Sequence, residues 1–233
     1  MHATVADAIT TYRGVALRDF VAETHAALSL ALYHLSAVPG IATTLQSTGR
    51  LSAAPELRVH EVSRLLLTIL DHGFDDLRSR SALRAMNRVH RNFTIPNDEF
   101  LYALSTFVIV PTRFIATAGP RPLTTTEREG TSRFYSELGR LMGVKHIPGS
   151  YTEFEEYFDA YERRHARGSV HGRELSDALS AFHRDTELGD ITNMASPAVR
   201  AAIADPPASS PEQPPAFGGC PFAHPPTSLP ETA

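Results

Sequence analysis

The sequence predicts an all-α fold followed by a proline-rich tail. Apolar residues recur with a helical period in several successive segments. Capping signatures stand at the starts of two of these segments. No segment alternates apolar and polar residues in the manner of a strand, and no hairpin dipeptide separates two apolar runs. Together these observations favour a bundle of helices.

The first half of the chain holds two predicted helices and a short helical turn. Residues 16–37 form an apolar segment that ends at Pro39-Gly40, because both residues stop helices. A turn over 41–46 follows. The strongest pattern covers residues 56–74, with Gly73 at the expected C-cap. One face of that segment carries Val59, Val62, Leu65, Leu66, Ile69 and Leu70.

The second half predicts five more helices. Residues 79–91 form one, and Asn97 is the expected N-cap of the next, over 99–118. Capping boxes, in which a hydroxyl and a carboxylate satisfy each other's free backbone donors, then predict helices over 125–142 and 152–166. The boxes are Thr124 with Glu127 and Ser150 with Glu153. A more polar helix over 172–185 completes the series.

Composition divides the chain into a helical domain over 1–190 and a tail over 191–233. Proline accounts for nine of the 29 residues from Asp205 to Ala233. Such a segment cannot form helix and has too little apolar surface to offset the entropy of ordering, which predicts disorder.

Bulk properties exclude several classes of protein. A net charge of −4 and a pI of about 6.2 offer no concentrated basic surface for nucleic acid. A single cysteine, Cys220, cannot form an internal disulfide. No signal sequence and no run of ~20 apolar residues is evident. We therefore expect a cytoplasmic protein without an integral membrane segment.

His90 is the most informative of the eleven histidines. Met86 and Leu83 precede it by four and seven residues, so its imidazole emerges from an apolar helix face. A histidine in this position is either a core residue with a satisfied ring or a ligand for a metal. The residue types leave both interpretations open.

A second group follows the opposite side of the 56–74 helix. His60, Arg64 and Thr68 are spaced by four, and Asp71 and His72 continue the stripe. Such a stripe is either a solvated helix back or the polar wall of a site.

The residues around His90 resemble the central motif of the MpaB-type oxygenases, which are relatives of the latex-clearing rubber oxygenases. The resemblance covers about residues 25–165. Its pieces are short, but their order and spacing agree with the family. They are Ala37-Val38-Pro39-Gly40, Arg64 with Thr68, Gly73-Phe74, Met86 to Leu104, Pro111 to Phe114, Arg121 to Arg128, Gly139 to Gly143 and Ile147-Pro148.

The resemblance implies that residues 1–190 form a helical domain around haem b, with His90 as the iron ligand. Rubber oxygenases carry an Arg-x-x-Lys-Thr segment on the distal side of the haem. Arg64 and Thr68 match its arginine and threonine, and are the implied catalytic residues, whereas Leu67 stands at the lysine position. The sixth iron ligand is therefore open, and rubber itself is an improbable substrate.

The resemblance also implies other contacts. Arg64, Arg91, Arg113 and Arg121 are candidates to pair with a haem propionate, or are ordinary surface arginines. Phe100, Leu104 and Phe107 line a cavity or pack the core. In the tail, Cys220-Pro221 resembles haem-regulatory motifs. The alternative is that Cys220 is a stray cysteine in a disordered segment.

The implied function is a haem b-dependent oxygenase that uses dioxygen to oxidise a carbon–carbon double bond in a hydrophobic small molecule, such as an isoprenoid or a secondary metabolite. The alternatives are a haem protein of other chemistry, similar to a peroxidase, a dehydrogenase or a cyclase, and a non-enzymatic haem sensor. A helical interaction module without a cofactor is the remaining interpretation, because fold does not fix function.

Overall fold

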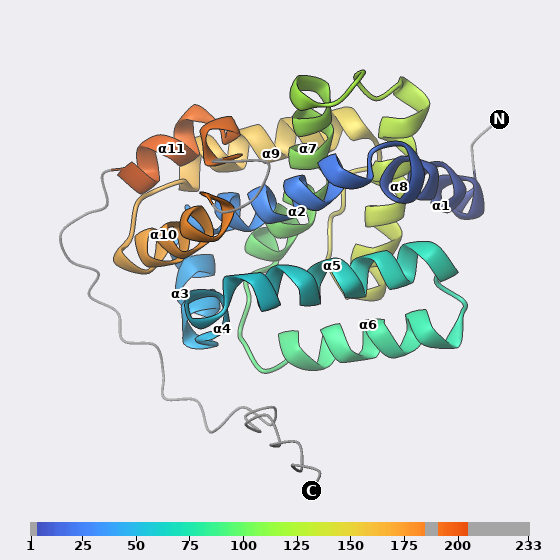
Figure 1. Cartoon of the computed structure of the whole chain (residues 1–233). Coiled ribbons are helices and arrows are strands. Elements are labelled where there is room, and N and C mark those ends of the chain that lie inside the picture. Colours follow the sequence, from blue (N-terminus) through green and yellow to red (C-terminus); the bar gives the residue numbers. More distant parts are fainter. Residues whose placement is uncertain (1–3, 185–190, 205–233) are drawn as a thin grey trace, which may run out of the picture.

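The computed structural model describes residues 4–184 and 191–204, and this part of the chain is entirely helical (Figure 1). The predicted all-α class is thus confirmed. The elements are α1 (Val5–Gly14), the π-helical η1 (Val15–Asp19), α2 (Val21–Ser36), α3 (Pro39–Ser47), α4 (Arg50–Ala53), α5 (Pro55–His72), α6 (Leu77–His90), α7 (Asn97–Ala118), α8 (Thr125–Leu141), α9 (Tyr151–His165), α10 (Val170–Arg184), the 3₁₀-helical η2 (Ile191–Met194) and α11 (Pro197–Ala204).

Two central helices, α2 and α7, form the core of the domain. They pack extensively against each other, and almost every residue of α2 from Ala26 to Ser36 is buried. Around them, α5 and α6 form an antiparallel pair on one side, α8 packs on α1, and α9 covers α7 (Figure 1). A helix that is apolar on all sides requires such neighbours on all sides.

The helix ends show how local chemistry sets the boundaries. The capping box of Thr124 and Glu127 is present, and Ser150 caps α9 through the amide of Glu153. Gly73 ends α5 with a positive φ of 72°, as predicted. Asn97 is not the N-cap of α7, however. Its side-chain amide instead bonds the backbone N–H and C=O of Lys145, at 2.8 and 3.1 Å.

Two segments differ from the sequence prediction at the N-terminal end. Helix α1 was not predicted, although a capping box of Thr4 and Asp7 begins it and it packs on α8. The expected helix over 16–37 is interrupted at Phe20, where the backbone leaves the helical region between η1 and α2. Phe20 itself is buried, so its packing in the core accompanies this break.

The predicted boundary between the helical domain and the tail, at residue 190, lies too early in the chain. The segments η2 and α11 are helical, and the side chains of Ile191, Val199 and Ile203 are buried. Residues 205–233, which contain Cys220-Pro221 and the predicted disorder, lie outside the described residues.

Helix α7 bears on the prediction that the chain has no integral membrane segment. By length and composition alone it could cross a bilayer, as could α2 and α3 together if their 109° bend were one broken span. In this protein, however, 67% of the apolar window of α7 is buried against other helices. Burial of this kind is typical of a core helix.

Candidate functional site

A cavity of about 440 Å³ lies between α2, α3, α5, α6, α7 and α8. This volume is within the range of small-molecule sites, and such sites are mostly apolar with a few placed polar groups. The apolar wall includes Leu35, Leu45, Val62, Leu65, Met86, Val89, Phe100, Leu104, Phe107 and Met142. The cavity-lining roles predicted for Phe100, Leu104 and Phe107 thus agree with the geometry.

His90 lines this cavity from the last turn of α6. Asp76 begins that helix by accepting a hydrogen bond from the Arg78 amide, and α6 then follows α5 as its antiparallel neighbour. The imidazole lies against the ring of Phe100, with 5.0 Å between the ring centroids and 59° between the planes. The helix hairpin therefore brings His90 to the start of α7.

The imidazole of His90 is neutral near pH 7 and incompletely bonded. Burial, and then the positive charge of Arg58, lower the pKa of His90 to about 4. Its Nδ1 atom is buried and has no hydrogen-bond partner among the described residues. An unpaired buried nitrogen costs free energy, so it calls for an explanation. Nδ1 has almost no accessible surface, so a ligand in the cavity would meet the imidazole at its other ring nitrogen, Nε2.

Charged side chains gather at one end of the cavity. Arg50 and Arg58 both approach the carboxylate of Glu61, with nitrogen–oxygen distances of 2.9 and 3.5 Å. Arg64 also lines the cavity, although it is exposed. Burial lowers the pKa of Arg58, but an arginine remains charged. Three arginines and two carboxylates, Glu61 and Glu99, thus give the cavity wall a net positive charge.

Arg58 and Glu61 were missed by sequence reasoning, although a signal was present. Arg58 precedes Val62 by four residues and Leu65 by seven, so it falls on the apolar face of α5. A charge on an apolar face is informative because it must either reach solvent or enter a site.

Two of the predicted distal residues are not in the cavity wall. The Thr68 hydroxyl donates to the Arg64 carbonyl at 2.7 Å, and neither Thr68 nor Leu67 lines the cavity. His60 is exposed, and Asp71 pairs with Arg13 at 2.9 Å. This stripe therefore fits the solvated helix back better than a polar wall, apart from Arg64.

The other predicted arginines also lie outside the cavity wall. Arg113 donates to Asp159 at 2.8 Å and to Glu155 at 3.0 Å, and these carboxylates raise its pKa. Arg121 pairs with Glu127 at 2.8 Å. Arg91 is exposed just beyond the end of α6. The structure thus offers Arg50 and Arg58, rather than Arg91 and Arg113, as cations beside the cavity.

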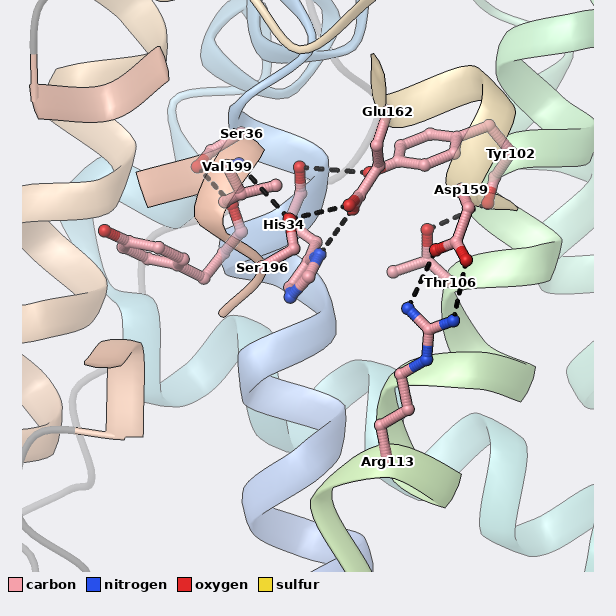
Figure 2. Close-up of polar contacts among 10 residues, drawn as sticks. His34, Ser36, Tyr102, Thr106, Arg113, Asp159, Glu162, Ser196 and Val199 are labelled. Carbon is pink, nitrogen blue, oxygen red and sulfur yellow. Dashed lines mark hydrogen bonds and ion pairs between the residues drawn. The ribbon is translucent and has the colours of Figure 1, made fainter. Parts of the chain in front are cut away.

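A second polar cluster lies apart from the cavity, and Glu162 is its centre (Figure 2). The His34 Nδ1 atom lies 2.6 Å from Glu162 Oε1, to which the Tyr102 hydroxyl also donates at 3.0 Å. Ser196 donates to Oε2 at 2.7 Å. Burial and the charge of Glu162 hold the pKa of Tyr102 well above its usual value, so the phenol remains a donor. We call these four residues the Glu162 network.

The fold and the cavity define an all-helical protein with a single-histidine apolar pocket. Residues 20–213 match the family described as "ER-bound oxygenase mpaB/B'/Rubber oxygenase, catalytic domain". The chain therefore belongs to this oxygenase family, and the resemblance drawn from the His90 motif is confirmed. No curated protein matches the chain.

The residues of the cavity fit a haem. The porphyrin supplies four ligands to its iron, so one protein imidazole is sufficient, whereas a bare ion needs several side chains. In the part of the chain that the structure describes, no three His, Cys, Asp or Glu side chains are grouped to hold a bare ion. His90 offers a neutral, unpaired imidazole beside an apolar wall, with cations at one end.

Proposed function

We propose that the protein is a haem b-dependent oxygenase that acts on a hydrophobic small molecule, with His90 as the axial iron ligand. The observation that carries this proposal is the imidazole of His90, which lines a largely apolar cavity in an oxygenase-family domain and has no hydrogen-bond partner for its buried Nδ1 atom. Metal binding requires the neutral form of histidine, which burial favours here.

Each part of the cavity has a proposed role. When bound, haem supplies the iron chemistry that uses dioxygen to oxidise a carbon–carbon double bond. His90 holds the iron, and Arg50, Arg58 and Arg64 pair with the propionates, because arginine matches carboxylate geometry. The aromatic and aliphatic wall holds the substrate and excludes water. Among the residues first implied as catalytic, Arg64 retains a place in the cavity, whereas Thr68 does not line it.

Reconstitution with haemin tests the proposal directly. We expect the purified chain to develop a Soret band on titration with haemin. His90→Ala should weaken haemin binding at least about tenfold, because iron loses its protein ligand. His60→Ala is the matched control, since His60 is exposed on α5 and does not line the cavity. Circular dichroism verifies that both variants remain helical.

Either of two outcomes would contradict the haem proposal: a wild-type chain that does not bind haemin, or a His90→Ala variant that binds it equally well. Oxygen uptake with isoprenoid and aromatic alkenes then tests the enzyme. Haemin binding without oxygen uptake across such a panel would replace the oxygenase with a haem sensor.

A further inference from the structure

Glu99 is an unpaired carboxyl in the cavity wall. It lies in the first turn of α7, is half-buried, and lines the same cavity as His90. Within residues 4–184 and 191–204 it makes no hydrogen bond and no ion pair. The other carboxyl of the wall, Glu61, is already held by two arginines. Only Glu99 is therefore an available acceptor among the carboxylates of this wall.

Gly40 provides the space that the Glu99 carboxyl occupies. Gly40 is the second residue of α3, and a Cβ atom at this position would collide with the carboxyl of Glu99. The backbone of Gly40 does not have the positive φ that would require glycine. Glycine also destabilises a helix relative to alanine. A side chain at residue 40 would therefore force the flexible Glu99 carboxyl to move.

We propose that Glu99 binds a hydroxyl group of the substrate, so that the cavity selects an apolar molecule with an alcohol at one end. This inference rests on the proposed function, because that function is what makes the bound molecule a substrate. It adds a residue and a chemical class to that function: Glu99 determines specificity, and an isoprenoid alcohol fits better than the corresponding hydrocarbon or ether.

A hydroxyl suits this position for two reasons. Burial, and then the negative charge of Asp98, raise the pKa of Glu99. A hydroxyl donates to the carboxylate and accepts from the protonated acid, so it bonds either state. An ammonium group would in addition meet the excess of arginine charge at this cavity. The apolar wall then accommodates the remainder of the molecule.

A matched pair of ligands provides the test. The full chain is loaded with the neutral fluorescent probe N-phenyl-1-naphthylamine, and the probe is displaced with farnesol or with farnesyl methyl ether. The ether retains the oxygen but cannot donate. We expect the wild-type chain to bind the alcohol about tenfold more tightly, which is the scale of a hydrogen bond to a charged group. Glu99→Ala should reduce this ratio to about one.

Two further variants separate recognition from structural effects. Asp98→Ala removes the neighbouring exposed carboxylate, which does not line the cavity, and should retain the wild-type ratio. Gly40→Ala keeps the glutamate at residue 99 but introduces a Cβ atom that displaces the Glu99 carboxyl. This variant should melt at the wild-type temperature or above it, because alanine favours helix, and yet should lose the preference for the alcohol.

The inference is overturned if the wild-type chain does not distinguish the two ligands, or if Glu99→Ala and Gly40→Ala both keep the wild-type ratio. The same measurement after haemin loading separates this inference from the proposed function. A preference for the alcohol in a chain that does not bind haemin would contradict the haem proposal alone. Haemin binding without any preference would contradict the role of Glu99 alone.

Discussion

Two histidines, the buried His34 and the half-buried His90, have opposite surroundings. His34 on α2 bonds Glu162, which in turn accepts hydrogen bonds from Tyr102 and Ser196 (Figure 2). His90 on α6 has a buried Nδ1 atom without a partner and faces a cavity. A buried polar group with hydrogen-bond partners stabilises the fold around it. A buried polar group without a partner costs free energy, and its presence calls for an explanation.

The comparison also shows why burial alone does not identify a site. His34 is the more deeply buried of the two, and its network joins α2, α7 and α9 to the segment that precedes α11. The bond from Ser196 to Glu162 ties the segment before α11 to α9. His90 is distinguished from His34 by an Nδ1 atom without a hydrogen-bond partner and by the cavity that it lines.

The largest expected effect concerns the Glu162 network. Glu162→Ala leaves the buried His34, Tyr102 and Ser196 without their acceptor, so we expect the free energy of unfolding to fall by about 3–5 kcal/mol. Urea denaturation followed by circular dichroism measures this change. Glu156→Ala, an exposed position on the same helix, is the control and should cost less than about 0.5 kcal/mol. A small loss for Glu162→Ala would show that this network is not what holds the domain together.

An intermediate effect is expected for the pH dependence that His90 confers on the free energy of unfolding. Its pKa is about 4 in the folded protein and about 6.5 when unfolded, so the unfolded chain binds the extra proton first. The stabilising contribution is therefore present above pH ~6.5 and is lost as the pH falls toward 4, at up to roughly 1.4 kcal/mol per pH unit.

His90→Leu removes this pH dependence and is expected to fold as well as the wild-type chain at pH 7, because the unpaired nitrogen is gone. Denaturation midpoints measured from pH 7 down to pH 4 test this expectation. Parallel curves for the two proteins would mean that the imidazole is solvated rather than buried.

The smallest effect is expected at Arg113, which belongs neither to the Glu162 network nor to the cavity wall. Arg113→Ala removes its ion pairs with Asp159 and Glu155, but the guanidinium is 41% exposed. We expect less than about 1 kcal/mol of lost stability and an unchanged affinity for haemin. Thermal melts and a haemin titration measure the two quantities. A tenfold weaker haemin affinity would restore Arg113 as a cofactor-binding residue.

Several features of this protein were determined by the sequence alone. The helical period of residues 56–74, the capping boxes and the proline content are local properties, so they predicted the all-α class and most helices. The motif around His90 likewise predicted the oxygenase family. Helix α1 also begins with a capping box but was not predicted, and its packing on α8 is a tertiary contact that the local pattern does not reveal.

Only the tertiary structure decided which side chains share a site. Arg64 and Thr68 lie one turn apart on the same face of α5, yet only Arg64 lines the cavity, while the short Thr68 side chain bonds the Arg64 carbonyl. Arg58 and Glu99 line the same cavity from different helices, and Gly40 lies against the Glu99 carboxyl from a third. His34 and Glu162 pair across 128 residues. Such contacts depend on how helices pack in space, which no local pattern along the chain encodes.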